Sequence, residues 1–128
     1  MVVAASVVAA CTGPTSCYFV GCTGSLTVHV APTLLAGDPD PSLRLCFDDA
    51  CQDVSVDPFR PSVVFGGLDV PSAPPMPELD PERDHSVTVT YVGADGTVTT
   101  IGPEPLSRFE PNGHECGPTC FGAEVQLG

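Results

Sequence analysis

The sequence predicts an all-β protein, an immunoglobulin-like antiparallel sandwich of about seven short strands. Seven segments alternate apolar and polar side chains with a period of two residues, as strands with one buried face do. Clusters of Gly, Pro, Asp and Asn separate these segments and indicate turns. No segment has the 3.6-residue apolar spacing and the capping residues of an amphipathic helix. The chain has no Trp, so the immunoglobulin-like expectation depends on strand number and length alone.

Each predicted strand follows from its own alternation. The predicted strands cover residues 25–31, 42–47, 51–56, 62–65, 86–92, 96–101 and 121–127. In the first of them Leu26, Val28 and Val30 share one face, which we expect to point into the core. Asp95-Gly96 lies between two alternating segments and predicts a β-hairpin there.

The longest interruption of this pattern covers residues 70–84 and is rich in proline. Proline favours extended polyproline geometry and cannot donate to a central strand ladder. We therefore expect residues 70–84 to cross over the surface from one sheet to the other.

Composition limits the partners of the protein. With 128 residues a single domain is expected. The net charge is −12 and there is no Lys, which excludes a nucleic-acid partner because phosphate binding needs clustered cations. The scarcity of Lys, Ile and Asn is typical of a GC-rich genome, and we expect an actinobacterial source.

The N-terminal residues predict a lipid anchor. Residues 1–10 have the apolar character of a signal-peptide h-region, although a basic n-region is missing. This suggests that the start codon is assigned too late or that the segment is truncated. Val8-Ala9-Ala10-Cys11 resembles the bacterial lipobox, and this resemblance implies that Cys11 carries lipid at the mature N-terminus. Residues 11–24 would then form the tether and 25–128 the domain. A secreted protein without lipid, or a buried Val-rich N-terminal strand, is the alternative.

The other six cysteines form three close pairs in the sequence. These pairs are Cys17 with Cys22, Cys46 with Cys51, and Cys116 with Cys120. Disulfides are expected in an oxidising compartment, and local pairing would close three small loops at turns. Six cysteines allow 15 connectivities, so the alternative that Cys22 crosses to another part of the fold stays open.

The sequence supports a catalytic or metal-binding role less well than it supports disulfides and a lipid anchor. His114 with Cys116 and Cys120 could offer a soft metal site, but zinc sites need four ligands at recognisable spacing. The acidic loops could hold Ca²⁺, yet none matches an EF-hand loop. No nucleophile elbow or local Cys/His signature indicates a hydrolase. We therefore expect neither an enzyme nor a cofactor, and a pocket with a histidine beside a carboxylate would reopen the question.

Two cysteine-containing segments resemble small extracytoplasmic proteins of actinobacteria. They are residues 46–51 (CFDDAC) and residues 111–120 (PNGHECGPTC). The resemblance implies a secreted or lipid-anchored β-domain and no known activity. Together these observations predict a lipid-anchored module of the cell envelope that binds an envelope protein or the wall, or has a structural role. The alternative function is extracytoplasmic metal binding by acidic loops or His114.

Overall fold

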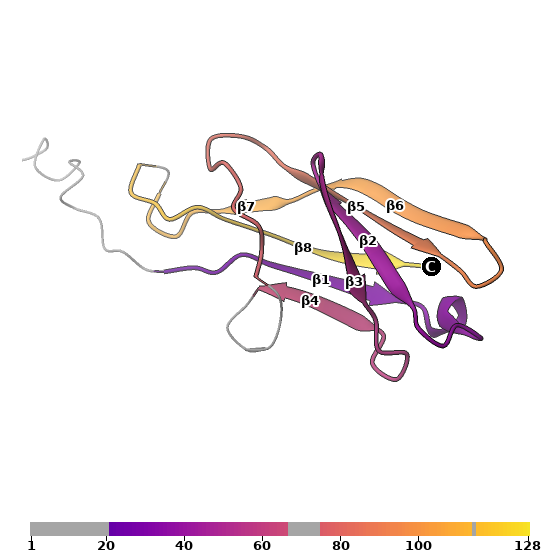
Figure 1. Cartoon of the computed structure of the whole chain (residues 1–128). Helices are drawn as coiled ribbons and strands as arrows, with labels where there is room; N and C mark the ends of the chain where they lie inside the picture. Colours follow the sequence, from indigo (N-terminus) through magenta and orange to yellow (C-terminus); the bar gives the residue numbers. More distant parts are fainter. Residues whose placement is uncertain (1–20, 67–74, 114) are drawn as a thin grey trace, which may run out of the picture.

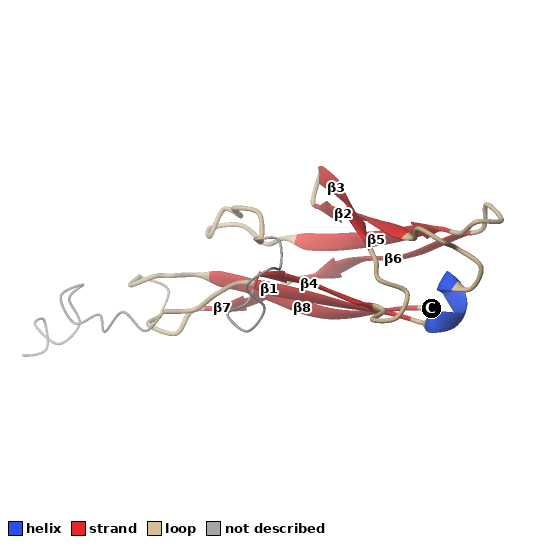
Figure 2. Cartoon of the chain, turned by 60° about the horizontal axis from the view of Figure 1, so that its bottom comes forward, coloured by secondary structure: helices blue, strands red, loops and turns tan. Residues whose placement is uncertain are grey.

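Two four-stranded sheets pack face to face in the computed structural model, which describes residues 21–66, 75–113 and 115–128 (Figure 1, Figure 2). Sheet A has the strand order β4-β1-β8-β7, and sheet B has the order β3-β2-β5-β6. The strands of sheet A are β1 (Ser25–Val30), β4 (Ser62–Gly66), β7 (Ser107–Phe109) and β8 (Cys120–Leu127). The strands of sheet B are β2 (Ser42–Phe47), β3 (Ala50–Ser55), β5 (Ser86–Val92) and β6 (Val98–Pro105). The prediction of an all-β sandwich is confirmed.

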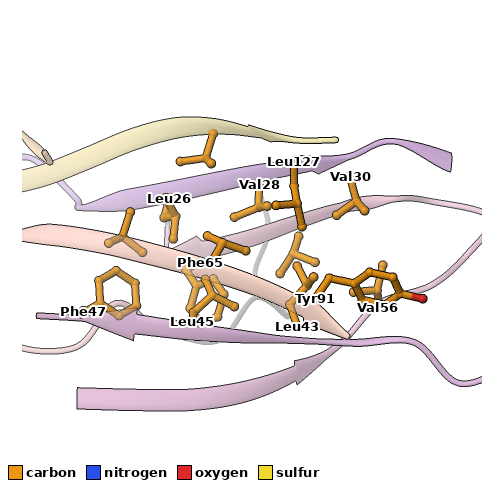
Figure 3. Packing of buried hydrophobic residues seen from close by; sticks show 14 of the residues in the cluster. Leu26, Val28, Val30, Leu43, Leu45, Phe47, Val56, Phe65, Tyr91 and Leu127 are labelled. Atoms are coloured by element: carbon orange, nitrogen blue, oxygen red, sulfur yellow. The ribbon is translucent and has the colours of Figure 1, made fainter. Parts of the chain in front are cut away.

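The core lies between the two sheets, where the alternating side chains predicted it (Figure 3). Leu26 and Val28 of β1 are 0% exposed, and they face Leu45 and Phe47 of β2 in the opposite sheet. Phe65 of β4 packs edge-on against Phe47, with ring centroids 6.1 Å apart. Burying each such side chain contributes about 1.5–3 kcal/mol, so these alternating strands supply most of the driving force for folding.

The first and last strands are neighbours and run parallel. Val28 of β1 pairs in register with Val125 of β8, while every other named strand pair of the described residues is antiparallel. The expectation of a wholly antiparallel sandwich is therefore corrected at this pair. Two further elements were absent from the prediction, namely β7 and the 3-10 helix η2 (Pro32–Leu35). Both are shorter than the window over which periodicity can be recognised.

The β5–β6 hairpin is confirmed, and glycine shapes it at two points. Gly96 adopts φ +86° in the turn, a conformation that L side chains rarely adopt. Further along β6, Gly102 has φ +111°, and a Cβ there would approach the Val87 carbonyl oxygen to 2.6 Å. The register of β5 against β6 shifts at this position, between Val87 and Val89, so Gly102 permits a local bulge in the pair.

The proline-rich segment connects β4 of sheet A with β5 of sheet B, as predicted for a crossover. Only residues 75–85 of it are described. Met76 and Leu79 pack against the core, so this part of the segment covers one end of the sandwich as well as linking the layers.

The sandwich has two distinct ends (Figure 1). At the end that we call the Cys22 end lie Cys22, the β2–β3 turn at residues 48–49, and the loop residues 110–113 and 115–119. At the opposite end, the η2 end, lie η2, the 57–60 turn and the 93–97 turn. No helix of the described residues is long and apolar enough to cross a membrane.

The cross-sheet contact of Phe65 gives a direct test of the core. Phe65→Ala removes a side chain that is 0% exposed and leaves a cavity, so we expect the free energy of unfolding in urea to fall by about 3–5 kcal/mol. The matched control is Phe59→Ala, because Phe59 is 93% exposed, and we expect a change within about 0.5 kcal/mol. Equal losses in the two variants would contradict the arrangement of the core.

Candidate functional site

The Cys46–Cys51 disulfide is confirmed. The two residues face each other in register across the β2–β3 hairpin. The turn between them contains Asp48, which adopts φ +53°, and Asp49. This bridge therefore fastens a hairpin at its tip, as the short spacing predicted.

The local pairing of Cys17 with Cys22 and of Cys116 with Cys120 is wrong, because Cys22 is bonded to Cys120 across a sequence separation of 98 residues. The cause is the parallel pairing of β1 with β8. Ser25 lies opposite Gly122, so Cys22, which precedes β1, and Cys120, the first residue of β8, come together at the same end of this strand pair. Cys116 is also disulfide-bonded. Cys11 and Cys17 lie outside the described residues, so the predictions for them stay predictions.

The acidic loops have a structural role that their sequence did not reveal. Four loop aspartates each accept a hydrogen bond from the backbone N–H two residues further on, at 2.9–3.1 Å. These are Asp38, Asp57, Asp80 and Asp95. Such contacts stabilise turns locally. Among the described residues no group of three or more His, Cys, Asp or Glu side chains converges as a metal site, and His114 lies outside them.

His29 forms a line of contacts with a serine and a carboxylate. Its Nδ1 lies 3.1 Å from Ser62 Oγ, and its Nε2 lies 3.4 Å from Glu124 Oε2. The three side chains come from β1, β4 and β8, on the solvent-facing side of sheet A. The side chain of Glu124 is 71% exposed. A catalytic triad needs a cleft that excludes water and orients substrate, and this open face provides none.

His85 lies beside Asp48 at the Cys22 end, next to a shallow pocket that includes both residues. The His85 Nδ1 atom lies 2.5 Å from Asp48 Oδ2, which is the arrangement of a base and its orienting carboxylate. However, Nε2 lies 2.7 Å from the carbonyl oxygen of Asp80. Both ring nitrogens are occupied, so His85 has no free nitrogen with which to accept a proton from a substrate or a nucleophile.

The η2 end contains a groove of about 340 Å³ between η2 and the β5–β6 turn. Its lining combines small and hydroxyl-bearing side chains, among them Thr33, Thr97 and Thr99. Tyr91 lies at its base and donates a hydrogen bond to Asp38 Oδ2 at 2.7 Å. Burial, with this bond and the Asp38 charge, raises the pKa of Tyr91 to about 12, so the phenol stays neutral and holds the loop before β2 in place.

Large apolar side chains are exposed mainly at the same end. Phe59 in the 57–60 turn is 93% exposed, and Val92 and Val98 are 56% and 59% exposed. Val92 and Val98 face each other across the start of the β5–β6 hairpin. Phe109, which is 58% exposed, lies on β7 toward the other end. The η2 end thus combines a groove with exposed apolar loops, as protein-binding surfaces do.

Comparison with known proteins gives no matching family model, no similar curated protein and no similar solved structure.

The two described disulfides differ greatly in the length of chain that they close. Taken alone in the chain-entropy model, a bridge across 98 residues contributes about 4–5 kcal/mol, and one across a separation of 5 residues contributes about 2 kcal/mol. The disulfide of Cys116 keeps most of the same long loop closed if its partner precedes Cys22, and the expected loss on removing Cys22–Cys120 is then about 2.5–3 kcal/mol. We therefore expect the Cys22→Ser/Cys120→Ser variant to lose more free energy of unfolding than the Cys46→Ser/Cys51→Ser variant, as measured in urea without reductant. A larger loss of free energy in the Cys46→Ser/Cys51→Ser variant would contradict a stabilising bridge between Cys22 and Cys120.

Proposed function

We propose that the protein is a lipid-anchored module of the cell envelope that binds an envelope protein or the wall through the loops of its η2 end. The observation that carries this proposal is the distribution of exposed apolar side chains. Phe59 belongs to the 57–60 turn between β3 and β4, Val92 ends β5 and Val98 begins β6. These parts of the chain lie at the end of the sandwich opposite to the one where the described chain begins (Figure 1). A domain that is tethered through its N-terminus would present these loops away from the membrane.

The accounting of the cysteines supports lipidation of Cys11. Cys22, Cys120, Cys46 and Cys51 are paired with one another, and Cys116 is also disulfide-bonded. If Cys11 carries lipid, the remaining partner for Cys116 is Cys17. All seven cysteines of the chain then have a role, and none is left as a free thiol.

Charge supports a covalent anchor rather than an electrostatic one. The net charge of −12 would repel the protein from an anionic membrane surface. Disulfides form in oxidising compartments, which agrees with a position outside the cytoplasm. A diacylglyceryl group, with a further acyl chain on the new amino group, would supply the two chains that stable anchoring needs.

The alternative of a metal-binding protein draws less support. Four of the loop aspartates are engaged in holding their own turns, and we assign no metal or cofactor to the described residues. We also assign no catalytic role, because both nitrogens of His85 are engaged and the face around His29 is open to water.

Lipidation can be tested with Cys11→Ala in a natural host. We expect this variant to appear in the medium with an unchanged melting temperature, whereas Ser16→Ala, the control, stays in the membrane fraction. Mass spectrometry of the control protein should show a lipid-modified Cys11 and a disulfide-linked pair of peptides containing Cys17 and Cys116. A Cys11→Ala variant that remains membrane-bound, or an unmodified Cys11, would refute the anchor.

The binding surface can be tested by photo-crosslinking in intact cells. A photoreactive residue in place of Phe59 should give a defined adduct with an envelope component. The control places the same residue at Asp49, which is also exposed but lies in the β2–β3 turn at the Cys22 end. We expect no adduct of that mass from position 49. Adducts from position 49 alone would place the working surface at the opposite end.

A further inference from the structure

His85 is almost completely buried at the Cys22 end, with 6% of its surface exposed. It immediately precedes β5, an interior strand of sheet B, and its ring packs edge-on against Phe121 of β8, with centroids 4.9 Å apart. It therefore lies between the two sheets, where a charged group is costly unless it is paired.

The two hydrogen bonds of the ring determine its protonation state. The carbonyl oxygen of Asp80 can only accept, so Nε2 of His85 must carry a proton. At Nδ1 the partner is a carboxylate oxygen of Asp48, whose other oxygen already accepts the backbone N–H of Ser86 at 3.0 Å. The hydrogen bonds from His85 and Ser86 hold the pKa of Asp48 below its ordinary value of 3.8. Asp48 is therefore ionised near neutral pH, and His85 is an imidazolium with both ring protons in place.

Several charged groups surround this pair. Asp48 comes from the β2–β3 turn, Arg83 opposes the imidazolium, and Asp84 lies in the same pocket. Arg108 of β7 stacks over Phe121 with 5.0 Å between its Cζ atom and the ring centroid. Arg108 also binds the carbonyl oxygens of Pro81 and Arg83. The remaining charged residues of these segments are Asp49, Asp80, Glu82 and Glu104.

We propose that His85 and Asp48 form a pH-dependent lock, which is closed while the imidazolium carries both protons and which opens the 80–84 turn at higher pH. The turn contains no strand. His85 attaches its first residue to the sandwich through the Asp80 carbonyl, and Arg108 holds the carbonyl oxygens of Pro81 and Arg83, so the lock acts on the Asp80 side of the turn. A neutral imidazole has only one N–H. One of its two contacts would then bring a ring lone pair against an oxygen at 2.5 or 2.7 Å, and this contact must break.

The direction of the pH dependence follows from the sign of the shift. Burial lowers the pKa of His85, but the hydrogen bonds to Asp48 and Asp80 and the charge of Asp48 outweigh burial, so the pKa rises above its ordinary value of 6.5. The lock is therefore at full strength below about pH 6.5 and weakens as the pH rises through the pKa of the folded protein. At the acidic limit it fails when Asp48 is protonated, below pH 3.8.

Two measurements on the ¹⁵N-labelled protein test the lock. Ring ¹⁵N shifts should show both nitrogens of His85 protonated at pH 6, with a midpoint above 6.5. Hydrogen exchange at the amides of Glu82 and Arg83, corrected for the intrinsic pH effect, should report opening of the turn. His85 has its ordinary pKa when the turn is open and a raised pKa when the turn is closed. Between these two pKa values, protection should fall about tenfold per pH unit.

The variants separate the lock from a general loss of stability. In His85→Gln we expect corrected protection of the turn to be low and independent of pH, and in Asp48→Asn the midpoint of His85 should fall. The control, His29→Gln, removes a partly exposed histidine of β1 and should behave as the wild type. A His85 ring with one unprotonated nitrogen at pH 6 would overturn the proposal. Corrected amide protection of the turn that does not change with pH in the wild type would also overturn it.

Discussion

The first and last strands, β1 and β8, lie side by side in the middle of sheet A, so this sheet exists only when the two ends of the domain meet. Parallel neighbours cannot form from a local turn, and bringing them together costs the closure entropy of the long chain between them. The Cys22–Cys120 bridge removes much of that entropic cost from the folding equilibrium, because it joins the region before β1 to the first residue of β8. The packing of Leu26 and Val28 against sheet B depends on this closure.

This constraint makes the two ends of the sandwich unlike each other. The Cys22 end is cross-linked by a disulfide, by the buried His85–Asp48 pair and by Arg108, which binds the 80–84 turn. At the η2 end the described side-chain contacts include the Tyr91–Asp38 hydrogen bond, and the described disulfides lie elsewhere. Binding loops placed on a rigid scaffold can vary without loss of the fold. This difference between the two ends agrees with the binding surface that we propose at the η2 end.

Much of the fold is predictable from the sequence because it depends on local patterns. Alternation identified each long strand, and Asp95-Gly96 identified the hairpin, since both signals act within a few residues. The strand that pairs with β1 was not predictable in this way, because the apolar side chains of β1 would be equally buried if β1 paired with another strand. The same limit explains the wrong local pairing of Cys22. His85 and Asp48 are 37 residues apart, and each appeared only as a polar residue at the end of a strand.

The buried ion pair has a physical consequence that an apolar pair would lack. Replacing a buried ion pair with well-packed apolar side chains is often neutral or stabilising, so stability alone does not explain an imidazolium in this position. Apolar side chains would, however, hold the 80–84 turn at every pH. Arg108 holds Pro81 and Arg83 at every pH, whereas the contact of His85 with Asp80 persists only within the range where His85 is protonated and Asp48 is not. The choice of these two residues therefore couples the Cys22 end of the sandwich to the proton concentration outside it, while the apolar core between the sheets, which has no such group, remains insensitive.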